Sequence, residues 1–238
     1  MGVNDPLARL AAAPSLAALI FDVDGTLAPI VPRPEDARVP ERVRAALRVL
    51  ADRYALVACL SGRPSVDAAR IVGVEGVRHV GEHGLELDPN AEAWAERLAV
   101  FAASVSWPAE AGKRLSLSFH YRQAADPDAA ETELQAVAER AEAAGFRARW
   151  GRRVLEVRPP LDADKGTAVR TLLDDAGVRR ALYAGDDTTD LDAFRGLDGL
   201  ELAVRVAVRS DESPAMLIES ADLVVDDPAA LAELMERL

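Results

Sequence analysis

Two aspartates, two positions apart, end the first apolar stretch of the chain. Asp22 and Asp24 lie in Ile20-Phe-Asp-Val-Asp-Gly-Thr-Leu27. In a strand, residues with this spacing point to the same side. Two close carboxylates repel each other and raise one pKa unless a cation lies between them. An Asp-Gly turn would account for Asp24 but not for Asp22, so the pair indicates a cation site.

A second acidic group follows another apolar run, in Tyr183-Ala-Gly-Asp-Asp-Thr-Thr-Asp-Leu-Asp192. Asp186 and Asp187 stand at the predicted end of a strand, and Asp190 comes about one helical turn later. An acidic helix N-terminus would account for one or two of these carboxylates. Hard oxygen ligands in such a cluster suit Mg²⁺, which binds one or two carboxylates together with water and substrate phosphate.

Two further junctions offer groups that bind anions. Ser61, in Cys59-Leu-Ser-Gly-Arg63, supplies a hydroxyl and backbone N–H groups at the end of a strand. Lys165 begins a predicted helix, a position that disfavours a cation unless something negative lies nearby. The alternatives are an ordinary helix cap at Ser61 and a surface lysine at Lys165.

These side chains converge only if the elements before them form one sheet. Short apolar runs at 17–23, 54–60, 77–80, 181–184, 202–208 and 222–225 predict fully buried strands. Amphipathic helical patterns at 40–53 and 165–176 lie between them, and Gly177 suits a helix end. This alternation predicts an α/β fold with a parallel sheet covered by helices on both faces. Ligands bind at the carboxyl ends of such strands.

The middle of the chain has a different pattern. Residues 115–122 and 146–158 alternate as half-buried antiparallel strands do, with a hairpin turn at 150–153. A helix is predicted at 128–144, ending at Gly145. We therefore expect an α+β domain at 86–160, inserted into a core domain formed by 1–85 and 161–238.

Composition limits the classes of partner. The chain has 238 residues and a net charge of −12, which argues against nucleic acid or an anionic membrane. The single cysteine, Cys59, excludes an intrachain disulfide and is predicted to be buried. We see no signal peptide and no apolar run near the ~20 residues that span a bilayer. A cytoplasmic, soluble monomer is expected.

Taken in order, the four motifs resemble those of the haloacid dehalogenase (HAD) superfamily of phosphatases, with an α+β cap between the second and third. Within that superfamily the chain resembles trehalose-6-phosphate phosphatases. The stretches that carry this resemblance are Gly81-Glu-His-Gly84, Lys113 with Leu115-Ser-Leu-Ser-Phe-His-Tyr-Arg122, Arg153-Val-Leu-Glu-Val-Arg-Pro159 and Asp186-Asp-Thr-Thr-Asp-Leu-Asp-Ala-Phe194. The resemblance implies a Rossmann-like parallel-sheet core with an inserted cap domain.

The resemblance also implies roles for the four motifs. Asp22 would be the nucleophile that forms an aspartyl-phosphate, and Asp24 the general acid and later the base. Ser61 and Lys165 would hold the phosphoryl oxygens.

A Mg²⁺ ion is implied at the same place. Its ligands would be the Asp22 side chain, the Asp24 backbone carbonyl and Asp186. Asp190 and Asp187 would support this metal site from behind.

Further residues are predicted to bind the substrate: Gly25, Gly62, Arg63 and His83 in the core, and Lys113, His120, Arg122 and Glu156 in the cap. A structural histidine is the alternative for His83, and a solvated strand face is the alternative for His120, Arg122 and Glu156. Two positions depart from the family pattern, Ala111 and Leu191, because an acidic residue is usual at each.

The resemblance implies a Mg²⁺-dependent phosphatase acting on a small sugar phosphate, with trehalose 6-phosphate as first candidate. A phosphatase for a sucrose- or mannosylglycerate-type phosphate is an alternative, and a phosphomutase is another. A catalytically silent binding protein on the same scaffold is a fourth reading.

Overall fold

The computed structural model describes residues 5–110, 112–151, 153–210 and 213–238. The chain divides into two compact units. The first combines Met1–Gly84 with Ala163–Leu238, and the second is Leu85–Asp162. Each unit has its own sheet and its own hydrophobic core.

A six-stranded parallel sheet organises the first unit, in the order β3-β2-β1-β7-β8-β9. Its central strands are buried on both faces, as the continuous apolar runs predicted. The α/β prediction is therefore confirmed. The strand bounds are β1 Ala18–Phe21, β2 Leu56–Leu60, β3 Arg78–Val80, β7 Arg180–Gly185, β8 Leu202–Val208 and β9 Leu223–Val225.

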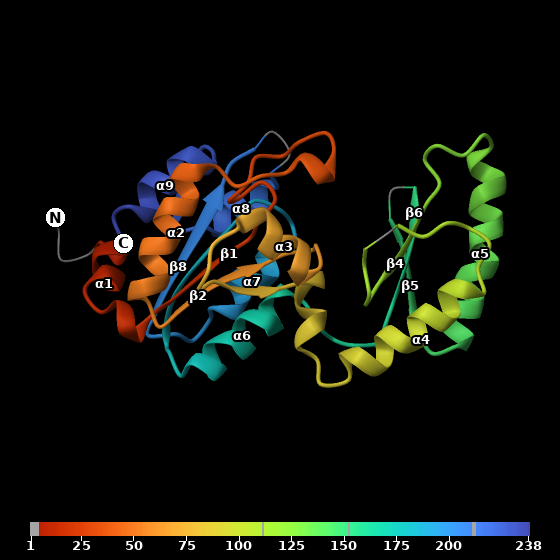
Figure 1. Ribbon diagram of the computed structural model, residues 1–238, viewed down its shortest axis with the longest axis horizontal. Helices are drawn as coiled ribbons and strands as arrows, with labels where there is room; N and C mark the ends of the chain where they lie inside the picture. Colours follow the sequence, from red (N-terminus) through yellow and green to blue (C-terminus); the bar gives the residue numbers. More distant parts are fainter. Residues whose placement is uncertain (1–4, 111, 152, 211–212) are drawn as a thin grey trace. The chain divides into compact units, whose positions relative to one another are not determined.

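Helices cover the sheet on two sides (Figure 1). One face of the strands packs with α1, α2 and α9 into a single hydrophobic core, while α6 and α7 pack against each other on the other side. The helices of this unit are α1 Pro6–Ala11, α2 Glu41–Arg53, α3 Ser65–Val72, α6 Lys165–Ala176, α7 Asp190–Gly196, α8 Ala215–Ser220 and α9 Pro228–Met235, with short 3-10 segments at Pro14–Leu16, Pro34–Asp36 and Glu82–Leu87.

The local sequence around helix α6 fixes Lys165 as the first residue of the helix. The Asp164 side chain accepts from the backbone N–H of Thr167, and the Thr167 hydroxyl accepts from the backbone N–H of Asp164. This reciprocal pair is a capping box, and it starts the helix. Gly177 ends it in a left-handed conformation, with φ of 65°. The predicted bounds of this helix, and its stop, are confirmed.

The second unit is an antiparallel sheet packed on two helices. Strands β4 Leu117–His120, β6 Val154–Arg158 and β5 Arg147–Gly151 lie in that order, and α4 Ala91–Ala103 and α5 Pro127–Ala143 cover one face. Residues 115–122 were expected to form a half-buried strand with Ser118 on its polar face, but Ser118 is only 4% exposed. Lys113 donates to its hydroxyl, with Nζ 3.2 Å from Oγ.

Within the described residues, no helix has both the length and the apolar character that crossing a membrane requires.

Candidate active site

The carboxyl edge of the parallel sheet gathers polar residues that lie far apart in the sequence. Asp22 directly follows β1, Ser61 follows β2 and Asp186 follows β7. These three strands are neighbours in the sheet, and the Asp22 backbone N–H donates to the Ala184 carbonyl of β7 at 2.9 Å. Parallel pairing thus delivers the three side chains to one edge.

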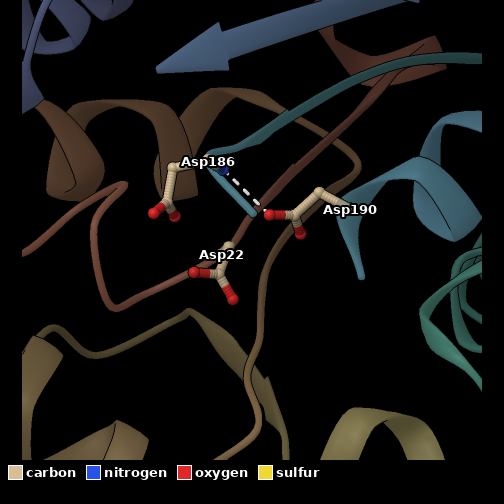
Figure 2. A group of neighbouring side chains, drawn as sticks. All are labelled: Asp22, Asp186 and Asp190. Carbon is tan, nitrogen blue, oxygen red and sulfur yellow. Dashed lines mark hydrogen bonds between the residues drawn. The ribbon is translucent and has the colours of Figure 1, made fainter. Parts of the chain in front are cut away.

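Three aspartates from this edge form a buried cluster. One carboxylate oxygen each from Asp22, Asp186 and Asp190 lies within 4.8 Å of the others. The exposed fractions of these residues are 6%, 5% and 0%. Figure 2 shows the three carboxylates around one common space, with Asp22 coming from the end of β1 and Asp186 and Asp190 from the segment that runs from the end of β7 to the start of α7.

Lys165 neutralises part of this cluster. Its Nζ lies 2.6 Å from Asp22 Oδ1 and 2.7 Å from Asp190 Oδ1, and the residue is 2% exposed. Burial alone would lower the pKa of this lysine, but the two carboxylates outweigh burial and raise it, so the ammonium stays charged. A positive charge at a helix N-terminus is explained by these two partners.

Asp190 has all its hydrogen-bonding capacity in use. Oδ1 accepts from Lys165 Nζ and from the Tyr183 hydroxyl at 2.6 Å. Oδ2 accepts from the backbone N–H groups of Asp186 and Asp187 at 2.8 and 2.9 Å. A carboxylate has about four lone-pair sites, so this arrangement suits a positioning group better than a metal ligand.

Asp186 keeps room for a further partner. Its Oδ1 accepts from the Thr26 hydroxyl at 2.9 Å. Gly25, with φ of +85°, lies so close that a Cβ there would overlap the Asp186 carboxylate. A glycine is therefore required for the Asp24-Gly25 backbone to approach Asp186. The Asp187 side chain is exposed and accepts from the Thr189 backbone N–H instead of joining the cluster.

The charge balance of the site fits a divalent cation. Three carboxylates and one ammonium would together carry two net negative charges in a buried space. Burial, with Asp190 and Asp186 nearby, raises the pKa of Asp22 well above its usual value, and burial raises the pKa of Asp186 to about 7. Oxygen ligands and this charge suit Mg²⁺, with Asp22 and Asp186 as the side chains that retain free lone pairs.

Ser61 and Arg63 form a second group at the same sheet edge. Ser61 is 1% exposed, and its Oγ accepts from the Arg63 backbone N–H at 3.1 Å, which leaves the hydroxyl proton available to an acceptor. The Arg63 guanidinium grips Asp24 with two bonds, Nε to Oδ2 at 2.6 Å and Nη2 to Oδ1 at 2.7 Å. These bonds raise the pKa of Arg63. Sequence reasoning expected Arg63 at the substrate and did not foresee this pairing.

His83 and Gly62 are placed together. The His83 ring is half-buried and lies beside the backbone of Gly62.

The second unit holds its own polar cluster, on the face of its sheet opposite the helices. Lys113 Nζ lies 3.0 Å from Glu110 Oε2, and His120 Nε2 lies 3.4 Å from the same oxygen. Burial raises the pKa of Glu110, but Lys113 and His120 outweigh burial and lower it. Glu156 pairs with Ser118 across the strands, so it shares this face. Arg122 lies exposed after β4.

Of the two departures from the family pattern, Ala111 lies outside the described residues and Leu191 lies in α7. Glu110, next to Ala111 in sequence, makes the contact to Lys113.

Three residues with clear structural contributions were missed from sequence. They are Thr26, which binds Asp186; Tyr183, which binds Asp190; and Glu110, which binds Lys113. A tyrosine inside an otherwise apolar strand was a usable signal, since a buried hydroxyl needs a partner. Glu110 stands three residues before Lys113, but loop geometry decides that contact.

Comparison with known sequences assigns a family. The Trehalose-phosphatase family model matches residues 20–112 and 111–224. Trehalose-phosphate phosphatase from Mycobacterium avium (strain 104) is 36% identical over 251 residues, covering 93% of this chain and 61% of that relative. A Mycobacterium tuberculosis (strain ATCC 25618 / H37Rv) protein named as an uncharacterized glycosyl hydrolase is 35% identical, covering 83% of this chain and 17% of its own. This chain thus spans about three fifths of the length of the first of these relatives.

Solved structures agree with the fold. Aspergillus fumigatus trehalose-6-phosphate phosphatase, crystal form 3, superposes with a TM-score of 0.65 at 26% identity, covering 98% of this chain and 96% of that one. A haloacid dehalogenase-like hydrolase from Bacteroides thetaiotaomicron superposes with a TM-score of 0.62 at 15% identity, covering 93% of this chain and 97% of that one. The predicted HAD-like core with a cap is confirmed as fold class, and the chain belongs to the trehalose-phosphatase family.

Proposed function

We propose that this protein is a Mg²⁺-dependent phosphatase that hydrolyses a sugar phosphate, with trehalose 6-phosphate as the first substrate to test. The observation that carries the proposal is the contact of Lys165 with Asp22 beside Asp186 and Asp190 at the sheet edge. The names of the relatives support the choice of sugar.

Asp22 is the proposed nucleophile. Its carboxylate oxygen attacks phosphorus, the bond from phosphorus to the sugar oxygen breaks, and an aspartyl-phosphate forms. Water then attacks phosphorus, which releases phosphate and restores Asp22. Lys165, which already holds Asp22 through Oδ1, and Ser61, with its available hydroxyl proton, donate to the phosphoryl oxygens.

Asp24 is the proposed acid and base. It gives a proton to the departing sugar oxygen and later takes one from the attacking water. Both of its oxygens accept from Arg63 in this structure, and because a carboxylate has about four lone-pair sites, a site remains on Asp24 for the proton. Arg63 meanwhile orients the carboxyl group.

A bound Mg²⁺ would be held by the Asp22 side chain, the Asp24 backbone carbonyl and Asp186, and would neutralise charge on the phosphoryl group. Asp190 is proposed to fix this arrangement through its four hydrogen bonds. Asp187 contributes through its backbone N–H.

Sugar recognition is proposed for the second unit. Lys113 and Glu156 share one sheet face and offer opposite charges to a polyhydroxylated ligand. His120 and Arg122 are proposed as further contacts, and Gly25, Gly62 and Arg63 as contacts near the phosphate. The cytoplasmic location and the monomeric state stay predictions.

A phosphate-release panel tests the proposal. Purified protein is assayed with Mg²⁺ on trehalose 6-phosphate, glucose 6-phosphate, sucrose 6-phosphate and mannosyl-phosphoglycerate, with and without EDTA. Preference for trehalose 6-phosphate, loss with EDTA and recovery with excess Mg²⁺ are expected. Metal-independent hydrolysis contradicts the site, and turnover that needs a bisphosphate activator indicates a phosphomutase.

A further inference from the structure

The turn at Gly81–Gly84 has an unusual backbone. Glu82 and His83 both adopt left-handed conformations, with φ of 47° and 56°, and Gly84 follows with φ of 96°. Two successive residues with side chains rarely take this conformation, and such strain persists only where the surroundings impose it. Glu82 is 2% exposed, so the turn is also firmly buried.

The turn is bonded to the loop that carries Ser61. The His83 backbone N–H donates to the Ser61 carbonyl at 2.9 Å, and the Glu82 backbone N–H donates to the Arg63 carbonyl at 3.0 Å. These two bonds stand on either side of Gly62. The strained turn therefore holds the backbone of the loop at both of its ends.

The His83 side chain fills the space between these bonds. A Cβ placed on Gly62 would lie 2.7 Å from His83 Nε2 and 2.8 Å from Cε1. Gly62 itself has no left-handed φ that would demand glycine. The absence of a side chain at Gly62 is thus explained by the imidazole ring, not by the backbone.

The opposite side of the turn meets helix α6. A Cβ placed on Gly84 would lie 2.6 Å from Ala168 Cβ and 3.1 Å from the Asp164 carbonyl. Asp164 caps the helix whose first residue is Lys165. One turn therefore lies between the loop of Ser61 and the helix start of Lys165, the two donors assigned to the phosphoryl group.

From this arrangement we infer that His83 is a positioning residue, whose ring sets the loop of Ser61 against Lys165 and does not bind the sugar. The inference rests on the proposed phosphatase function. A residue that acts on the phosphoryl donors affects every phosphate monoester alike, whereas a sugar contact affects only the sugar phosphate.

A steric double-mutant cycle tests this with His83→Ala, Gly62→Ala and the double variant. Each protein is assayed for kcat and KM on trehalose 6-phosphate and on p-nitrophenyl phosphate, and its melting temperature is measured. His83→Ala is expected to lower kcat on both substrates by the same factor, about ten- to a hundredfold, because small misplacements have effects of this size. Gly62→Ala forces a clash, and the double variant is expected to exceed it in both kcat and melting temperature.

Two results overturn the inference. One is a loss confined to trehalose 6-phosphate with p-nitrophenyl phosphate hydrolysis intact, which makes His83 a sugar contact. The other is a double variant no better than Gly62→Ala in activity and melting temperature. If the unmodified protein hydrolyses neither ester, the proposed function fails, and the melting temperatures alone still decide whether Gly62 and His83 are coupled.

Discussion

The two units hold their polar side chains in different ways. In the first, Lys165 and its partners Asp22 and Asp190 are almost completely buried, with side chains 0–8% exposed. In the second, the side chains of Lys113 and Glu110 are 24% and 41% exposed. Buried charges are strongly destabilising when one partner is removed, whereas exposed pairs contribute little. The first unit thus fixes the geometry of its charged groups, whereas the second leaves its charged pair partly open to solvent.

The largest effect is expected from replacing the proposed nucleophile. Asp22→Asn is expected to lower kcat by roughly 10⁴-fold or more, because the amide cannot form the covalent intermediate. The asparagine oxygen can still accept from Lys165, Asp190 still balances the ammonium, and burial disfavours a charge at position 22, so the melting temperature should hold or rise. Trehalose 6-phosphate turnover and thermal unfolding measure the two effects. If the variant still turns over substrate, Asp22 is not the nucleophile.

The two lysines offer a matched pair. Lys165→Met is expected to lower kcat by about 10²- to 10³-fold and to destabilise the fold by about 3–5 kcal/mol, since it leaves buried carboxylates unpaired. Lys113→Met should change the free energy of unfolding by about 1 kcal/mol or less and act mainly on KM. Urea unfolding and steady-state kinetics compare them. Equal losses of stability would erase the distinction between the units.

The affinity for Mg²⁺ should depend on pH because of a carboxyl group in the first unit. The pKa of Asp186 is raised to about 7, and a bound metal requires the deprotonated carboxylate. Below pH 7 a proton competes with the metal, so the apparent Mg²⁺ affinity is expected to fall about tenfold per pH unit. Calorimetry in two buffers of different ionisation enthalpy measures the released proton. An affinity that stays flat between pH 5.5 and 7.5 contradicts this assignment.

The smallest expected effect belongs to the second unit. Glu156→Gln should raise KM for trehalose 6-phosphate by about tenfold, in line with a lost charge-assisted hydrogen bond. Hydrolysis of p-nitrophenyl phosphate should not change, because that ester has no sugar. An equal loss of activity on both esters would indicate that Glu156 acts on phosphoryl transfer and not on sugar binding.

Much of the first unit was predictable because its signals are local. Continuous apolar runs identify β1, β2 and β7, and the polar residues directly after them, Asp22, Ser61 and Asp186, identify the sheet edge. Asp164 and Gly177 mark the N-cap and the C-terminal end of α6. Where side chains meet only through tertiary packing, the sequence does not identify the partner: the contacts of Arg63 with Asp24 and of Tyr183 with Asp190 depend on distances between elements.

The second unit was less predictable for a related reason. Its strands were placed from their alternation, but α4 was not found, and Ser118 is buried although the alternation placed it on the polar face of a half-buried strand. Lys113 covers that serine from a loop, and loop conformations leave no periodic trace in a sequence.

The contact of Gly84 with Asp164 has a consequence for how the chain tolerates change. The chain leaves the first unit after Gly84 and returns at Ala163, and a Cβ on Gly84 would lie only 3.1 Å from the Asp164 carbonyl. The segment Leu85–Asp162 is therefore equivalent to a long loop inserted into the first unit, and the residues that flank it, Gly84 and Asp164, are in contact. Loop-closure entropy grows only with the logarithm of length, so insertions, deletions or a transplanted segment at this junction should leave the stability of the sheet nearly unchanged.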